Sequence, residues 1–213
     1  MKLHLKKNSK EPSSKDINLI LELFTSNKII EAKLCVDKEI QKYPNSSILL
    51  NILGAIFAEQ NKLNEAIKNY KNAIKINPNY FQAYNNLGIA FSKLNKFNDS
   101  IDSYKKAINI NSNFAEAYNN LGNAFVFKDD LRKALENFEK ALKINTSYSE
   151  AYNNLGYVNK ILGKEAEALN CYQQAIKFKP DYAQAYNNIG IIFNDRGNFD
   201  EALKSYKKAT SVK

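Results

Sequence analysis

The sequence contains few of the residues from which catalytic and metal sites are built. Among its 213 residues there is one histidine, His4, and there are two cysteines, Cys35 and Cys171. A zinc site needs several placed histidine or cysteine ligands, and no catalytic set can be assembled around a single histidine. The glycines form no phosphate-binding loop. We therefore expect no catalytic residues, no metal and no cofactor, and a protein that is not an enzyme.

Long apolar stretches are also missing. No run approaches the roughly 18 residues that cross a membrane, so we expect no membrane contact. The segment from Met1 to Lys15 is basic, but no apolar stretch follows it, which argues against a secretory signal. We expect residues 1–12 to form a basic disordered tail that ends at Pro12.

Glycine is scarce as well, yet its placement is regular. The chain has seven glycines, and five of them lie 34 residues apart, at Gly54, Gly88, Gly122, Gly156 and Gly190. A period of this length indicates a stacked repeat protein. Such a protein functions by presenting a long surface rather than by enclosing a reaction.

Each repeat contains two amphipathic helical segments. In one repeat Tyr84, Leu87 and Phe91 share a helical face, and further along Ile101 and Tyr104 share another. Residues that tolerate a left-handed conformation separate the two segments, at Asn61, Asn95, Asp129, Gly163 and Gly197. Residues that make good N-caps precede the next repeat, at Asn79, Asn113, Ser147 and Asp181.

The repeated glycine predicts a close helix contact. Glycine inside a helix costs roughly 0.5–1 kcal/mol relative to alanine, so its recurrence indicates that two helix backbones touch there. We expect Ala66, Ala134 and Ala168 on the second helix to supply the matching flat patch, with aromatic residues filling the wider gaps.

These motifs resemble the tetratricopeptide repeat, whose signature is W-x2-L-G-x2-Y, then A-x3-F, then P. Here Tyr84, Leu87, Gly88 and Phe91 match the first part, and Tyr152-x2-Leu155-Gly156 is followed by Ala168-x3-Tyr172 and Pro180. Tyrosine replaces the signature tryptophan, and Asn159 and Ser100 are further departures. The resemblance implies an all-α, right-handed solenoid of about six helix-turn-helix units. We place these units at 13–46, which is divergent, and at 47–80, 81–114, 115–148, 149–182 and 183–213.

A ladder of amide side chains is the strongest candidate site. In this family the first helices line the inner groove, and pairs of asparagines recur just before each Leu-Gly or Ile-Gly. The predicted peptide-binding residues are Asn51, Gln82, Asn85, Asn86, Glu116, Asn119, Asn120, Asn123, Glu150, Asn153, Asn154, Tyr157, Gln184, Asn187 and Asn188.

Asparagine is costly in a helix by roughly 0.5–0.7 kcal/mol relative to alanine, but an amide donates and accepts at once. It therefore suits the main chain of an extended peptide. The ladder also resembles the groove of O-linked N-acetylglucosamine transferases. The alternative is that an asparagine-rich composition and repeat duplication produced the ladder without a ligand, in which case alanine in place of Asn86, Asn120 and Asn154 would leave binding unaltered. If the ladder binds a ligand, the same changes weaken binding and leave the melting temperature unchanged or raised.

The net charge of +9 raises the question of a nucleic-acid partner. The basic residues fall mainly on the second helices, which the family places on the outside, and the aromatic residues are expected to be buried. Both points disfavour nucleic acid. Cys35 and Cys171 share one register in repeats four units apart, too distant for a disulfide. Free thiols indicate a reducing compartment, and we expect a cytoplasmic protein.

The last repeat ends without an additional polar helix. We therefore expect apolar exposure around Ile192, Phe193, Leu203 and Tyr206. The main prediction is a non-catalytic scaffold that binds a protein or peptide, of unknown identity, in its concave groove. The alternatives are a substrate-recruiting segment of a larger glycosyltransferase, sulfotransferase or hydroxylase, and self-association through the open end.

Overall fold

The computed structural model describes residues 11–212, and this part of the chain is built from α-helices with no strand. Residues 1–10 of the predicted tail lie outside the described residues. The helices are α1 (Ser14–Thr25), α2 (Ile29–Lys42), α3 (Ser47–Glu59), α4 (Leu63–Ile76), α5 (Phe81–Lys93), α6 (Phe97–Ile110), α7 (Ala115–Phe127), α8 (Leu131–Ile144), α9 (Ser149–Ile161), α10 (Glu165–Phe178), α11 (Ala183–Asp195) and α12 (Phe199–Ser211).

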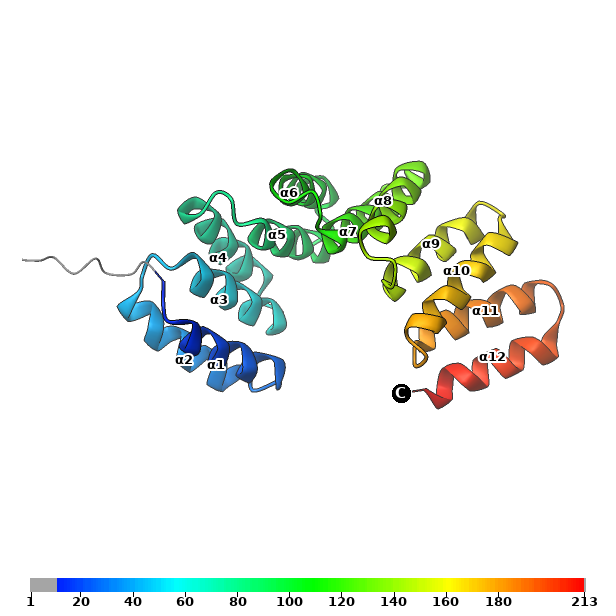
Figure 1. Ribbon diagram of the computed structural model, residues 1–213, viewed down its shortest axis with the longest axis horizontal. Coiled ribbons are helices and arrows are strands. Elements are labelled where there is room, and N and C mark those ends of the chain that lie inside the picture. Colours follow the sequence, from blue (N-terminus) through cyan, green and yellow to red (C-terminus); the bar gives the residue numbers. More distant parts are fainter. Residues whose placement is uncertain (1–10, 213) are drawn as a thin grey trace, which may run out of the picture. The chain divides into compact units, whose positions relative to one another are not determined.

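The helices form hairpins, and the hairpins stack within two compact units, residues 1–110 and 111–213 (Figure 1). We call the described parts the N-terminal unit, α1–α6, and the C-terminal unit, α7–α12. In each unit every helix contacts the next one in sequence, and the first helices of successive hairpins also touch, such as α3 with α5 and α7 with α9. This stacking is the predicted all-α solenoid architecture.

The turns inside the hairpins were predicted correctly. Asn61, Asn95 and Asp129 have φ values of 57°, 58° and 58°, and Gly163 and Gly197 have 74° and 75°. This left-handed conformation is strained for most residues but accessible to glycine, asparagine and aspartate. It reverses the chain after the first helix, so that the second helix packs back along it.

The predicted N-caps were wrong. The helices begin after Tyr80, Phe114, Tyr148 and Tyr182, and none of these residues makes a side-chain cap. Instead, Asn77 Oδ1 accepts from the Asn79 backbone N–H at 3.1 Å, and Asn111 and Asn145 make the same bond to Asn113 and Ser147. An asparagine side chain that bonds two residues ahead forms a turn of its own. The turn therefore uses the asparagine before the predicted cap, and the helix starts later.

The recurrent glycines pack most closely against an aromatic ring, and at Gly156 the Ala168 carbonyl oxygen is also near, 3.1 Å from an added Cβ atom. A Cβ atom on Gly122 would lie 2.6 Å from Phe138 Cε1, and one on Gly88 would lie 2.5 Å from Tyr104 Cε1. The same relation joins Gly54 to Tyr70, Gly156 to Tyr172 and Gly190 to Tyr206. The alanine patch that we predicted is therefore not the main contact. The aromatic ring of the residue sixteen positions later lies against each glycine, and there is no room for a side chain on the glycine beneath this ring.

Candidate functional site

The two asparagines of each pair occupy different environments. The first member is buried in four hairpins, with exposed fractions of 8% for Asn51, 2% for Asn85, 5% for Asn119 and 1% for Asn153. The fifth, Asn187, is exposed, because no later hairpin covers it among the described residues. The second members, Asn86, Asn120, Asn154 and Asn188, are half-buried. The prediction had placed both members on one accessible face.

Hydrogen bonds join the pairs of neighbouring hairpins. Asn154 Nδ2 donates to Asn119 Oδ1 at 3.0 Å, and Asn188 Nδ2 donates to Asn153 Oδ1 at 2.9 Å. In the N-terminal unit Asn86 Nδ2 donates to Asn51 Oδ1 at 3.0 Å. A buried carbonyl without a donor costs about 1–3 kcal/mol. In these three pairs the second asparagine therefore satisfies the buried first asparagine of the preceding hairpin, which is a structural role for part of the ladder.

Tyrosines at the start of the next hairpin complete this network. Asn51 Nδ2 donates to the Tyr80 hydroxyl at 3.4 Å. The Tyr148 hydroxyl pairs with Asn119, and its pKa is raised to about 12 by burial and by the carboxylates of Glu116 and Glu150, while the Asn119 bond acts in the opposite sense. Both phenols thus stay neutral at physiological pH, which suits their place between two hairpins.

The charged and longer polar residues of the predicted site lie on the solvent side. Gln82, Glu116 and Gln184 are exposed, and Glu150 is half-buried. Burial alone would raise the pKa of Glu150, but its backbone N–H, the Ser149 hydroxyl and Lys179 together lower it. Lys179 Nζ lies 3.4 Å from Glu150 Oε1. Glu150 is therefore an ionised and paired carboxylate.

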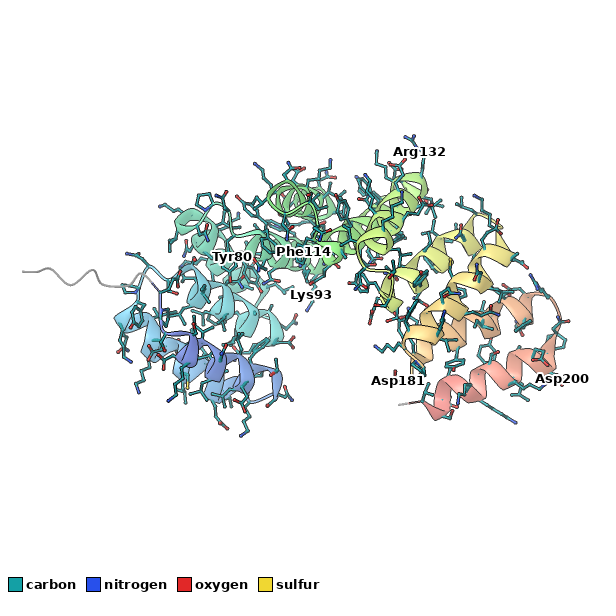
Figure 2. All side chains as sticks on the ribbon, viewed as in Figure 1. Tyr80, Lys93, Phe114, Arg132, Asp181 and Asp200 are labelled. Atoms are coloured by element: carbon teal, nitrogen blue, oxygen red, sulfur yellow. The ribbon has the colours of Figure 1, made fainter. Side chains whose placement is uncertain are left out.

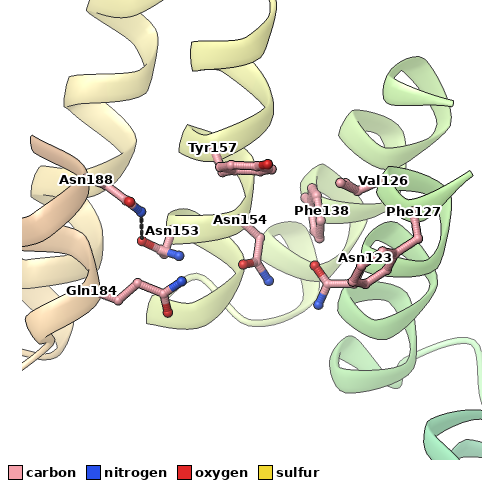
Figure 3. Close-up of a pocket in the computed structure, with 9 residues that line it drawn as sticks. All are labelled: Asn123, Val126, Phe127, Phe138, Asn153, Asn154, Tyr157, Gln184 and Asn188. Carbon is pink, nitrogen blue, oxygen red and sulfur yellow. Dashed lines mark hydrogen bonds between the residues drawn. The ribbon is translucent and has the colours of Figure 1, made fainter. Parts of the chain in front are cut away.

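The C-terminal unit contains a pocket of about 310 Å³ on the face of its first helices. Figure 3 shows its nine lining residues, which are Asn123, Val126, Phe127, Phe138, Asn153, Asn154, Tyr157, Gln184 and Asn188. Six of them belong to the predicted peptide-binding set. The carboxamides of Asn123, Asn154 and Gln184 are turned toward the same opening (Figure 3). The structure therefore brings part of the ladder together around one cavity.

Sequence reasoning missed the apolar wall of this pocket, which consists of Val126, Phe127 and Phe138. Phe138 is fully buried, as expected for an aromatic residue that fills a gap between the helices. Phe127 carried a usable signal, because it stands five residues after Gly122, where two other repeats have Glu59 and Lys93. The last repeat has Asp195 there and the repeat after Phe127 has Ile161, so an apolar residue at this position marks two repeats as different from the three charged ones.

The remaining expectations concern surfaces away from the pocket. The lysines assigned to the outer face are exposed: Lys68, Lys71, Lys75, Lys105, Lys106, Lys133, Lys140, Lys143, Lys204, Lys207 and Lys208. Arg132 and Asp200 likewise project from the first turns of α8 and α12 (Figure 2). The basic charge is therefore carried on solvated second helices.

Cys35 and Cys171 are free cysteines. The pKa of the Cys171 thiol is raised, because the effect of burial is larger than the opposing effect of the Asn159 side chain, whose Nδ2 donates to Sγ at 3.9 Å. Within residues 11–212 no cluster of histidine, cysteine and carboxylate side chains suits a metal ion. No helix in that range combines the length and the apolar character needed to cross a membrane.

The apolar end of the C-terminal unit differs in detail from the prediction. Leu203 is 52% exposed, as expected, but Ile192 is fully buried in a cluster with Tyr172 and Ile189. Phe199, which had not been singled out, is 68% exposed. The exposed apolar surface therefore lies on α12, whereas α11 is covered by the helices on both sides of it.

Comparisons with known proteins agree with this architecture. The family model described as TPR repeat matches residues 54–95, 90–129 and 160–194. Models described as tetratricopeptide repeat match 115–148, 183–213 and 137–170. No curated protein matches the sequence significantly.

Several solved structures share the fold. MamA is 33% identical with a TM-score of 0.64, and the match covers 74% of this chain and 92% of MamA. PilF of Pseudomonas aeruginosa is 16% identical with a TM-score of 0.80, covering 93% of this chain and 96% of PilF. YrrB, described as a TPR protein with an unusual peptide-binding site, is 21% identical with a TM-score of 0.62, covering 84% of this chain and 92% of YrrB. From the family matches, which together span residues 54–213, and the identity with MamA, we conclude that the chain belongs to the tetratricopeptide repeat family.

Proposed function

We propose that the protein is a non-catalytic scaffold that holds an extended segment of a partner protein along the first helices of its C-terminal unit. The single observation behind this proposal is the group of carboxamides that converge on the pocket between α7, α9 and α11. Tetratricopeptide membership supports the general role, since such arrays present surfaces for protein interaction. The description of YrrB as peptide-binding is consistent with it.

The pocket amides have hydrogen-bonding capacity to offer. Asn154 and Asn188 use one N–H each on the preceding hairpin, and each keeps a carbonyl oxygen and a second N–H. The side chains of Asn123 and Gln184 make no hydrogen bond to another residue of the described chain. These groups match the alternating N–H and C=O of an extended main chain, whatever its side chains.

The expected affinity is modest. Each hydrogen bond of this kind contributes about 0.5–1.5 kcal/mol net, and association carries its own entropic cost. A few such bonds with some apolar contact give dissociation constants in the micromolar range, which correspond to a binding free energy of about −8 kcal/mol. Such values are typical of a reversible adaptor.

A second function, self-association, is favoured by the exposure of Phe199 and Leu203 on α12. The corresponding residues of earlier hairpins, such as Leu63 and Ile67 on α4, are half-buried or buried beside the next hairpin. A hairpin contributed by a second molecule would cover Phe199 and Leu203 in the same way. Light scattering tests this: a mass that rises with concentration and falls with Phe199→Glu supports it, and a constant monomer mass rejects it.

The peptide proposal is tested with a displayed library of random dodecapeptides selected on the protein. We expect Asn123→Ala with Gln184→Ala to weaken binding of the selected peptides about tenfold, equivalent to 1.4 kcal/mol. Neither residue supports a buried group, so the fold is retained. The matched control is Asn170→Ala with Gln173→Ala, an exposed pair on the second helix α10. Equal binding by both double variants would reject the amide face as the site.

A further inference from the structure

We propose that the pocket of the C-terminal unit receives one large apolar side chain, aliphatic or aromatic, from the extended partner segment. This inference rests on the proposed peptide-binding function and adds a requirement on the sequence of the partner. It would make one partner position decisive, while the amides bind the main chain on either side of it.

The first argument is the composition of the pocket walls. Phe127 and Tyr157 are 69% and 47% exposed, although aromatic side chains of this size are usually covered. Val126 lies beside Phe127 on α7, and Phe138 on α8 closes the wall behind it. Figure 3 shows Val126, Phe127 and Phe138 on the side of α7 and α8, and Tyr157 on the side of α9, with the carboxamides of Asn123 and Asn154 between them. A partner side chain placed here would remove exposed aromatic surface from water.

The second argument is the absence of charge. None of the nine lining residues is ionisable in the physiological range, and each polar one is an amide except for the Tyr157 phenol. A lysine or glutamate side chain of the partner would lose hydration there without gaining an opposite charge, which is costly. The walls therefore select an uncharged, apolar side chain.

The third argument is size. A pocket of about 310 Å³ is at the lower end of the range of ligand sites, roughly 300–1,000 Å³. That space suits one bulky side chain with its adjoining main chain. Binding sites commonly concentrate their energy in such single aromatic or aliphatic anchors, which sit in small desolvated pockets.

The fourth argument comes from the N-terminal unit, two repeats earlier in sequence. There Glu59 stands in place of Phe127, Ala58 in place of Val126 and Ile89 in place of Tyr157. Glu59 is exposed, and it would place a carboxylate at the same point of the hairpin. The pair of aromatic side chains, Phe127 and Tyr157, is therefore absent from this earlier junction, and in the next repeat Ile161 and Ile191 stand in their places. Such variation on a common framework is expected for a determinant of specificity.

The inference is tested with acetyl- and amide-capped nonapeptides of serine and alanine that differ only at the central residue. Titrations followed by ¹H–¹⁵N NMR give dissociation constants for central phenylalanine, leucine, alanine, lysine and glutamate. We expect the phenylalanine or leucine peptide to bind at least tenfold more tightly than the other three. Phe127→Glu should reduce its affinity to that of the alanine peptide. Ile30→Glu is the matched control, because Ile30 is 75% exposed on α2 and lies outside the pocket.

The outcomes separate the inference from the proposed function. If the alanine peptide shifts the carboxamide signals of Asn123 and Asn154, and phenylalanine gives no gain, the apolar pocket is rejected and the amide face stands. If no peptide shifts these signals, both proposals fail. If N-acetylphenylalaninamide binds as tightly as the nonapeptide, the pocket takes a small aromatic molecule, and the peptide anchor is overturned. Loss of binding in Ile30→Glu but not in Phe127→Glu also overturns it.

Discussion

The N-terminal and C-terminal units share a framework but differ on the surface of their first helices. Both have a glycine beneath an aromatic ring, as in Gly54 with Tyr70 and Gly122 with Phe138. Both also use an asparagine bond between hairpins. Five residues after the glycine, however, the N-terminal unit has Glu59 and the C-terminal unit has Phe127. The comparison shows that packing positions repeat closely, whereas exposed positions of the first helices differ between the units.

The largest effect is expected from breaking the shared framework. Replacing Gly122 with leucine should force the Phe138 ring away and lower the free energy of unfolding by about 1–3 kcal/mol or more. Gly88→Leu should cost a similar amount in the N-terminal unit, because Tyr104 lies equally close. Urea unfolding measures both. The neighbouring change Asn123→Leu, on the pocket side, should be nearly neutral, and equal losses for all three would contradict the packing account.

The next effect concerns the asparagine bonds between hairpins. Asn154→Ala removes the donor to the buried Asn119 carbonyl and should destabilise the protein by about 1–3 kcal/mol. This reverses the expectation that alanine in place of the second asparagines leaves the melting temperature unchanged or raised. In a double-mutant cycle with Asn119→Ala the two losses should not add. Additive losses, or an unchanged melting temperature for Asn154→Ala, would show that the bond contributes little.

A transplant sharpens the difference between the units. Introducing Ala58→Val, Glu59→Phe and Ile89→Tyr copies the apolar walls into the N-terminal unit. We expect isothermal titration with the phenylalanine nonapeptide to show two sites per chain in place of one, with a second affinity within about tenfold, or 1.4 kcal/mol, of the first. In the otherwise unchanged protein, Phe127→Glu should leave no site that binds this peptide with comparable affinity. A stoichiometry that stays at one in the transplanted protein would mean that further residues define the pocket.

The smallest effect involves the tyrosine hydroxyl at the hairpin junction. Tyr148→Phe removes one hydrogen bond to Asn119 and should cost about 0.5–1.5 kcal/mol. The raised pKa of Tyr148, about 12, means that the unfolded chain ionises first. The contribution of Tyr148 to stability is therefore complete below about pH 10 and is lost as the pH rises toward 12.

Unfolding measured between pH 9 and pH 12, a range about the ordinary tyrosine value, checks this sign. Stability should fall across the range, and it should fall less steeply in Tyr148→Phe than in the wild type. Since Tyr80 is also buried and its pKa is raised, Tyr80→Phe is the matched variant in the other unit. If stability falls equally steeply with pH in the wild type, Tyr148→Phe and Tyr80→Phe, the raised pKa values of these two tyrosines do not contribute to the loss.

The sequence determined the fold well because the framework is local and repeated. The 34-residue spacing of the glycines, the residues that permit the left-handed turns and the apolar stripes each follow from helix geometry within one hairpin. The helix starts were wrong because two asparagines compete within a short turn, and Asn77 rather than Asn79 forms the side-chain bond.

The candidate site was only partly accessible to the same reasoning. Adjacent residues such as Asn153 and Asn154 differ by about 100° around a helix, and only the position of the next hairpin decides which of them is covered. Both line the pocket, but Asn153 is a buried acceptor for Asn188, whereas Asn154 is half-buried and its carboxamide is turned toward the opening. Phe127 stands out in the sequence as an apolar residue where three other repeats are charged, but only the packing of the hairpins places its exposed side chain in one pocket with Asn123 and Tyr157.

The most direct test of the central claim is to locate a bound peptide. In a complex with the nonapeptide that carries central phenylalanine, nuclear Overhauser contacts would be measured from that ring to protein side chains. We expect contacts to Val126, Phe127 and Tyr157, with main-chain contacts to Asn123 and Asn154. Contacts confined to second-helix residues such as Arg132 and Lys140 would contradict the account.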